Sequence, residues 1–263
     1  MRRLTSLVLA LALLAPASML AQEDSSERGQ LYQVTTWNVD PADMEGFEKG
    51  VKLFVQAAEK AGSSYRWTIW QKGSEYVFAY PVSDYAYFDD PGQFMRSIAG
   101  TEGEADAQEA MKVFPALNMT VVSEEMVELK DAWSYKVESF DMQTVTVAHL
   151  DVMWTKPGSD EAFDKLNKEW VAFFKDLGHP YPYDGHSVRF GDSGRTIYVT
   201  YIDDLSDYHG KNDMMKMIEA KNMGERWQGL DEQFNATVRR WDHYDMNYRR
   251  DMSYWPMPEG ATN

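Results

Sequence analysis

Residues 47–62 read FEKGVKLFVQAAEKAG, and residues 163–178 read FDKLNKEWVAFFKDLG. Residues of the first stretch recur in the second 116 positions later, among them Phe47, Lys49, Val55 and Gly62, which match Phe163, Lys165, Val171 and Gly178. Further along the chain the offset becomes 120: Met95, Ile98, Phe114 and Asp131 match Met215, Ile218, Phe234 and Asp251. A long repeat whose offset drifts by only a loop's length is typical of two diverged copies of one domain.

Both stretches have the pattern of an amphipathic helix. In the first, apolar residues at spacings of three and four form one face: Phe47, Val51, Phe54, Val55 and Ala58. Pro41 precedes this helix and Gly62 follows it, as expected at a helix start and end. The second helix is expected over residues 160–177, with Gly178 as its cap.

Strand patterns surround the two helices in the same order in each copy. In the first copy we expect strands at 31–39, 65–71, 76–82 and 121–129, a helix at 104–117, and an irregular segment at 83–103. In the second copy we expect strands at 145–154, 186–190 and 196–202, then helical segments and a last extended stretch to about 248. The predicted domains are a first repeat at 31–135, a linker at 136–144 and a second repeat at 145–255.

Each copy therefore reads β-α-β-β-α-β, the order of a ferredoxin-like domain. Such a domain has an antiparallel sheet with helices on one face, so the open faces of two copies can cover each other. The predicted fold class is α+β, with two tandem ferredoxin-like repeats packed sheet to sheet as an intramolecular α+β barrel. On this element order and the repeat, the chain resembles the dimeric α+β barrel superfamily (antibiotic-biosynthesis monooxygenase-like) in a tandem fused form. The resemblance spans about residues 31–255 and implies an oxidoreductase or a binding role, with haem as a cofactor in some members.

The N-terminus has the features of a secretory signal peptide over residues 1–21. Arg2 and Arg3 form a short basic region, an apolar run follows at 7–14, and small residues precede cleavage after Ala17 or Ala21. The run is shorter than the roughly 20 residues that a membrane-spanning helix needs. We expect an exported protein, in a bacterial periplasm, with a disordered polar lead-in at 22–30 and a C-terminal tail at 256–263.

Composition excludes several kinds of chemistry and partner. The chain has no cysteine, so a lipid anchor on the signal, thiolate chemistry and cysteine-bound metal centres are excluded. The formal net charge is −16, and without Arg2 and Arg3 the 24 basic and 42 acidic residues that remain give −18. An acidic surface repels nucleic acid and anionic lipid, so neither nucleic-acid binding nor membrane insertion is expected. No glycine-rich phosphate loop or Gly-x-Ser-x-Gly elbow is present.

Aromatic residues are abundant, with 9 Trp, 15 Tyr and 12 Phe. Several fall on predicted strands, among them Trp37 and Trp67 in the first copy. They would either stack on a small aromatic or planar ligand or fill the core of a protein without disulfides. Since aromatic residues favour strands in any case, core filling is the preferred interpretation. Trp37 and Trp67 remain candidate ligand-binding residues.

His149 and Asp151 are the candidate catalytic pair. They lie two apart on a predicted strand, so their side chains share a face, and a carboxylate beside an imidazole can raise its basicity. The first copy has Thr35 and Trp37 at the matching positions, so the two halves differ here. His186 opens a strand and is expected to face the same cavity. A buried polar pair with no catalytic role is the alternative interpretation.

The remaining histidines give no metal motif. His209 follows an acidic loop, but the spacing matches no known set of ligands, so no metal is predicted. A haem-degrading protein would bring an Asn, a Trp and a His together, and Asn38, Trp67 and His209 are the residues available. No spacing argument links them, so no cofactor is predicted, with haem as the alternative.

Two functional hypotheses remain. The first is an exported binding or interaction protein without a catalytic set, which predicts a cavity filled by side chains and His149 bonded within a closed core. The second is a monooxygenase-like oxidoreductase, cofactor-independent or haem-linked, which predicts a roomy cavity at His149 and a perturbed pKa. No set of catalytic residues converges in the sequence, which favours the first and leaves it open whether the protein is an enzyme. The chain is expected to be a pseudo-dimer that could form higher oligomers.

Overall fold

The computed structural model describes residues 29–85, 92–192, 194–210 and 212–255. The predicted signal peptide, most of the lead-in and the tail at 256–263 lie outside these residues. Among the described residues, no helix is long and apolar enough to cross a membrane.

The two halves of the chain have closely similar element orders. The first half contains β1 (Leu31–Val39), α1 (Met44–Ala61), β2 (Thr68–Lys72), β3 (Glu75–Val82), α2 (Gln93–Ile98), α3 (Glu104–Val113) and β4 (Met119–Leu129). The second half contains β5 (Val147–Thr155), α4 (Asp160–Leu177), β6 (Tyr183–Phe190), β7 (Arg195–Ile202), α5 (Leu205–His209), α6 (Met214–Ala220), α7 (Gly224–Thr237) and β8 (Val238–Tyr248).

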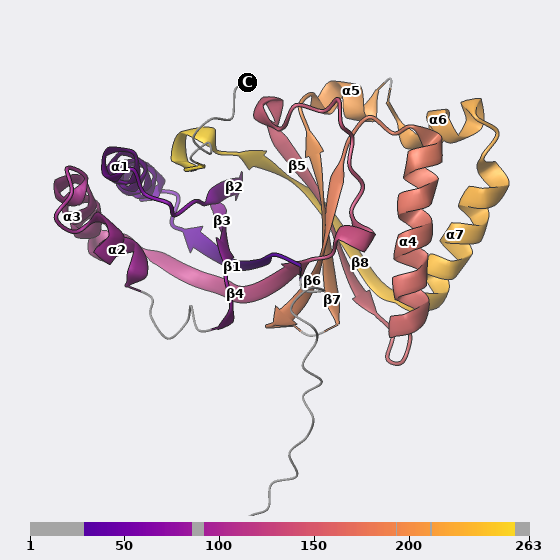
Figure 1. Ribbon diagram of the computed structural model, residues 1–263, viewed down its shortest axis with the longest axis horizontal. Coiled ribbons are helices and arrows are strands. Elements are labelled where there is room, and N and C mark those ends of the chain that lie inside the picture. Colours follow the sequence, from indigo (N-terminus) through magenta and orange to yellow (C-terminus); the bar gives the residue numbers. More distant parts are fainter. Residues whose placement is uncertain (1–28, 86–91, 193, 211, 256–263) are drawn as a thin grey trace, which may run out of the picture.

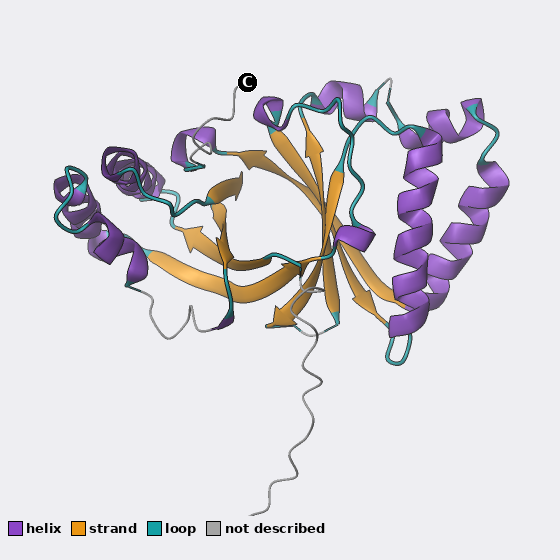
Figure 2. Ribbon diagram, viewed as in Figure 1, coloured by secondary structure: helices purple, strands orange, loops and turns teal. Residues whose placement is uncertain are grey.

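All eight strands form one closed antiparallel barrel in the order β1-β3-β2-β8-β5-β7-β6-β4. The two halves join edge to edge, β2 to β8 on one side and β4 to β6 on the other. The expected intramolecular α+β barrel is confirmed, and hydrogen bonds across both seams join the two sheets edge to edge within it. Closure pairs strand edges that would otherwise be exposed. Helices α1 to α3 cover one outer side of the barrel and α4 to α7 the other (Figures 1 and 2).

The alternation of side chains along each strand creates separate apolar layers. One cluster fills the barrel interior and is made of residues from β4, β5, β6 and β7: Val127, Val152, Trp154, Val188 and Ile197. A second packs α4 and α7 against the outer face of the second half, and its buried members include Phe163, Leu166, Phe173 and Leu177. A third packs α1 on the first half around Phe47, Val51, Ile69 and Tyr76. The helix-side layers and the barrel interior are thus distinct environments.

Most predicted element bounds agree with the structure. The strand at 31–39 and the helix at 160–177 are found at those residues, and Gly62 and Gly178 follow their helices with left-handed φ of 58° and 62°. The segment expected to be irregular contains the short helix α2. The second strand begins at Thr68 rather than at 65, because Trp67 makes an isolated bridge to Tyr254 instead of joining the hairpin.

The ends of the two halves cross over to each other. After β4, the short 3-10 helix Asp131–Trp133 packs on α4, and the Trp133 indole N–H donates to Asp164 Oδ1 at 2.8 Å. After β8, the 3-10 helix Arg250–Met252 packs on α1 in the same way. Each half therefore supplies a segment that covers the helix of the other.

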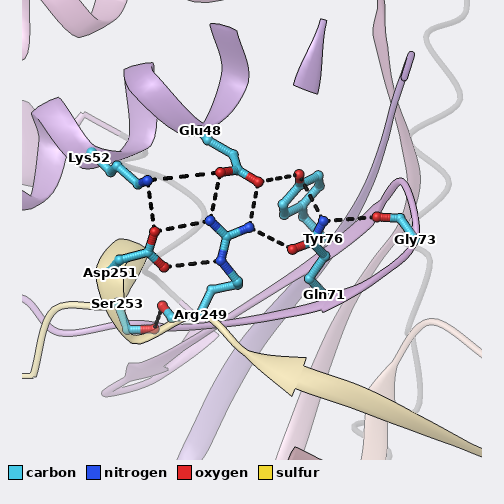
Figure 3. A network of polar contacts seen from close by, with 8 residues as sticks. All are labelled: Glu48, Lys52, Gln71, Gly73, Tyr76, Arg249, Asp251 and Ser253. Atoms are coloured by element: carbon cyan, nitrogen blue, oxygen red, sulfur yellow. Dashed lines mark hydrogen bonds and ion pairs between the residues drawn. The ribbon is translucent and has the colours of Figure 1, made fainter. Parts of the chain in front are cut away.

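A dense polar network holds the segment that follows β8 against α1 and β2 (Figure 3). The Arg249 guanidinium donates to both carboxylate oxygens of Glu48 on α1, to both oxygens of Asp251 at 3.0 Å and to Gln71 Oε1 on β2 at 2.6 Å. Tyr76 donates its hydroxyl to Glu48 Oε1 at 2.9 Å. The guanidinium holds the pKa of Glu48 below its ordinary value and lowers that of Asp251 to about 2. The C-terminal end of the second half is thereby tied to α1 and β2 of the first.

Candidate functional site

A cavity of about 460 Å³ lies between α4, α7 and the outer face of the second-half strands. This volume falls within the range of small-molecule sites. Its walls are mainly aromatic rings from α4, α7 and the sheet: Phe163, Trp170, Phe174, Tyr183, Tyr198, Trp227, Phe234 and Trp241. Several rings pack edge to face, such as Trp170 and Trp227 with centroids 5.1 Å apart. These contacts fix the shape of the walls.

Two neighbouring strands place a histidine between two carboxylates at this cavity. His149 and Asp151 lie on β5 and share the helix-facing side, as their spacing predicted. Asp245 lies directly opposite His149 on β8, and its Oδ1 is 2.7 Å from His149 Nδ1. Asp151 Oδ1 is 3.7 Å from Nε2, the other ring nitrogen. The imidazole is therefore flanked by a carboxylate on each nitrogen.

The two carboxylates determine the charge of His149. Burial by itself lowers the pKa of this imidazole, but the combined attraction and hydrogen bonding of Asp151 and Asp245 outweigh burial and raise it from 6.5 to about 9. The side chain is 15% exposed, so little solvent screens these interactions. At neutral pH His149 is thus an imidazolium. Its Nδ1–H donates to Asp245, and its Nε2–H faces Asp151 at a distance longer than a hydrogen bond.

Other polar groups hold this pair in place. The Trp241 indole N–H donates to Asp151 Oδ1 at 2.8 Å. The rings of Tyr208 and His243 lie 5.7 Å and 5.9 Å from the His149 ring. Burial, followed by the nearby carboxylates, raises the pKa of Tyr208, so its hydroxyl stays protonated. These contacts orient Asp151 and His149 toward the cavity.

The cavity contains a second polar point, at Asn167 on α4. Its Oδ1 accepts a hydrogen bond of 2.5 Å from the Tyr198 hydroxyl. Within the described part of the chain its Nδ2 has no hydrogen-bond partner, although the residue is only 3% exposed. Buried amide N–H groups are normally paired. Asn167 therefore presents an unused donor among aromatic walls.

The structure separates the other candidates from this site. His186 was expected to face the cavity of His149, and this is corrected. It lies on the barrel-interior face of β6, where its ring meets Tyr32 edge-on at 5.9 Å, and burial lowers its pKa. The reason is alternation, since Tyr183 on the same strand faces α4 and His186 is three residues further on.

Trp37 and Trp67 both lie in the first half and do not line the cavity. Trp37 is half-buried on β1 opposite Tyr76. Trp67 donates its indole N–H to the Met252 carbonyl at 2.8 Å, and its ring packs on Tyr254 at 5.2 Å. In these positions both tryptophans contribute to packing of the first half.

The carboxylate-flanked histidine and the charge of the lining are a poor match for haem. An iron ligand needs a neutral imidazole; His149 is held as an imidazolium by two carboxylates, although His179, His209 and His243 also line the cavity. Haem also carries two carboxylates, but none of the described lining residues is Lys or Arg. The three residues considered for a haem site stay apart: Asn38 accepts from Ser74 and Trp67 packs on Tyr254, while His209 lines the second-half cavity.

Sequence reasoning missed Asp245 and Asn167. Asp245 is 96 residues from His149, and only the pairing of β5 with β8 brings them together. Asn167 could have been noticed in the sequence, because it lies four residues after Phe163 and three before Trp170 on the apolar face of its helix. A polar residue in such a stripe indicates either a buried hydrogen bond or a ligand contact.

Comparisons with known proteins support the fold. No protein-family model matches the sequence, and no curated protein matches it. Three similar solved structures share its architecture. A candidate monooxygenase from Fusobacterium nucleatum is 11% identical, with a TM-score of 0.54 over 84% of this chain and 93% of its own. An anthrone oxidase-like protein is 13% identical, with a TM-score of 0.51 over 86% and 92%. A mutant chlorite dismutase from Candidatus Nitrospira defluvii is 12% identical, with a TM-score of 0.50 over 86% and 93%.

At these identities the likeness shows the fold and no more. The closed antiparallel barrel with helices on both outer sides, together with these neighbours, gives the chain the dimeric α+β barrel fold. The fold hosts several activities, so function has to be argued from the cavity at His149.

Proposed function

We propose that this protein is a monooxygenase-like oxidoreductase whose substrate is a small planar aromatic molecule bound in the cavity at His149. One observation carries the proposal: a histidine flanked by two carboxylates faces a roomy cavity with aromatic walls. The non-catalytic interpretation that the sequence favoured requires a filled core around His149, and the cavity there argues against it. Neighbours of the same fold include a candidate monooxygenase and an anthrone oxidase-like protein, so such an activity is compatible with the fold.

The site supports proton removal without a bound cofactor. The substrate we propose carries a CH₂ group conjugated through an aromatic ring with a carbonyl, as in anthrone, and Asp151 accepts one of its protons. The Nε2–H of the His149 imidazolium then donates to the oxyanion that forms, a type of stabilisation that is strong in a dry site. The electron pair of the carbanion passes to O₂, giving a hydroperoxide that loses water. In balance, CH₂ and O₂ yield C=O and H₂O, so the substrate supplies all the electrons.

Oxygen uptake with anthrone as the probe tests this function. We expect uptake by the wild type, with one ¹⁸O atom from ¹⁸O₂ in the product, and a loss of at least about 100-fold in His149→Gln, as for removal of a general acid–base group. Asp160→Asn is the matched control, since Asp160 is an exposed residue of α4 outside the cavity. Wild-type uptake no faster than the rate in buffer, or full activity of His149→Gln, would refute the proposal.

We also infer that a β-α-β-β-α-β ferredoxin-like unit was duplicated and fused, with repeats at 31–135 and 145–255. The closely similar element order of the halves and the reciprocal crossing of their ends support this. A symmetric dimer exchanges equivalent segments in the same way. Expression of residues 145–255 alone tests the inference. A folded homodimer is expected, and a chain that stays unfolded at high concentration would count against it.

Export remains a proposal from the N-terminal sequence. N-terminal sequencing of the protein from its own host is expected to find a chain that begins at Ser18 or Gln22. A chain that retains Arg2 and Arg3 in the cell interior would contradict export.

A further inference from the structure

Carboxylates dominate the charges around the cavity. Asp151, Asp213 and Asp231 line it, and among the described lining residues none is Lys or Arg. The His149 imidazolium is already balanced by Asp151 and Asp245. Asp213 and Asp231 accept local hydrogen bonds from the Lys216 amide and the Asn235 side chain, and no cation pairs with either among the described lining residues. A ligand entering here meets an excess of negative charge.

The walls strengthen this preference. Trp170 and Trp227 lie together, and Trp241 packs edge-on against Phe234 with ring centroids 5.7 Å apart. The faces of Trp, Tyr and Phe rings attract cations, most strongly where water is excluded. Aromatic faces combined with carboxylates favour a positively charged organic group. The same surroundings disfavour a carboxylate, sulfonate or phosphate, which would be buried without a partner.

The unused N–H of Asn167 is independent evidence for the ligand's chemistry. This group is buried, lines the cavity and has no partner among the described residues. An oxygen acceptor on the ligand would satisfy it. Replacing a neutral acceptor with an apolar group would leave the N–H unpaired.

From these observations we infer the substrate class, an inference that rests on the proposed function: an aromatic carbonyl compound without acidic substituents, preferably with a basic amino or ammonium group. Its carbonyl oxygen accepts from Asn167 Nδ2 with one lone pair and, as the oxyanion forms, from His149 Nε2–H with another. The amino or ammonium group of the ligand lies near Asp213 and Asp231.

Binding of a matched ligand series tests the charge preference. The series is 2-acetylnaphthalene and its 6-carboxylate and 6-trimethylammonium derivatives, measured by calorimetry at 20 mM NaCl. We expect the ammonium compound to bind at least about 5-fold more tightly than the neutral ketone and the carboxylate at least about 10-fold more weakly, with both ratios shrinking at 500 mM NaCl. Asp213→Asn and Asp231→Asn keep their local hydrogen bonds and should each reduce the ratios. Asp160→Asn, the same charge change away from the cavity, should not.

The Asn167 contact needs its own comparison. Wild type should bind 2-acetylnaphthalene about 5-fold more tightly than 2-ethylnaphthalene, as expected for one hydrogen bond. Asn167→Leu should abolish that ratio. Tyr198→Phe, which removes the neighbouring hydroxyl and keeps the amide, should preserve it.

The outcomes separate this inference from the proposed function. Equal or tighter binding of the carboxylate, or no binding of any of the three ketones at 1 mM, overturns the inference even if His149-dependent oxygen uptake is found. The predicted ranking in a protein that consumes no oxygen supports the inference about the ligand and refutes the oxidoreductase proposal.

Discussion

The charge of His149 makes folding stability depend on pH in a defined window. The folded pKa of about 9 lies above the ordinary value of 6.5, because Asp151 and Asp245 favour the imidazolium more than burial opposes it. A group with a raised pKa stabilises the folded state fully below its unfolded pKa, and this contribution is lost as the pH rises toward the folded pKa. We therefore expect stabilisation by His149 below pH 6.5 and its loss between pH 6.5 and about 9.

The size of this effect follows from linkage. Each pH unit between the two pKa values corresponds to about 1.4 kcal/mol, so the full contribution is about 3 kcal/mol. It falls to roughly 2–3 kcal/mol at pH 7, to roughly 1 kcal/mol at pH 8 and to a small fraction of that at pH 9.

Urea unfolding of the wild type and His149→Gln between pH 6 and 9.5 measures this contribution, as the difference in unfolding free energy between the two proteins. NMR titration of the ring gives the pKa directly. Asp245→Asn should lower the pKa of His149. Asp242→Asn is the matched control on the same strand, and it should leave that pKa unchanged because Asp242 pairs with Arg240. A His149 pKa at or below 6.5, or a free-energy difference that is the same at pH 6 and pH 9, would refute the reasoning.

Three further predictions concern the polar network around Arg249, the packing against α1 and the reaction. Arg249→Met should cost about 1–3 kcal/mol in urea unfolding, because the partly buried Glu48 loses its two-point partner and keeps only Tyr76 and a longer contact to Lys52, whereas Lys112→Met at an exposed pair should cost under about 0.5; equal losses would contradict the network's role. Gly103→Ala should lower the melting temperature, since a Cβ there would lie 2.1 Å from a backbone carbonyl of α1, whereas Gly224→Ala has open space and should be neutral or stabilising. Oxygen uptake should fall about tenfold per pH unit above pH 9 as His149 loses its proton; an uptake that rises there would assign His149 as a base instead.

The sequence predicted the helices and strands well wherever one local pattern decided them. The helix at 160–177 follows from apolar spacing and the glycine after it, and both signals come from neighbouring residues. The hairpin between β2 and β3 follows likewise from Gly73, whose φ is 59°. Short helices such as α2 were missed, because six residues give too little periodicity to distinguish a helix from a loop.

The candidate site was predicted only in part, because local sequence patterns determine only some of its residues. His149 and Asp151 share a face because side chains alternate along a strand, and this needs no tertiary information. Which face points to the helices depends on the packing of α4, so the placement of His186 could not be settled beforehand. Asp245 depends on the register between β5 and β8. The repeat showed that the halves differ at His149 and Asp151, and the tertiary structure showed that these residues line a cavity.

The sequence by itself determined that the chain is built of two related halves, each with strands and helices in one order, since periodicity and turn residues act over a few positions. Only the tertiary structure decided that β2 joins β8 and that β4 joins β6. It also decided that the segment after the last strand of each half packs on the first helix of the other half. These pairings join residues more than 50 positions apart. Their register is set by which apolar faces are buried and which strand edges remain unpaired. The charge of His149 and the shape of the cavity result from those long-range contacts.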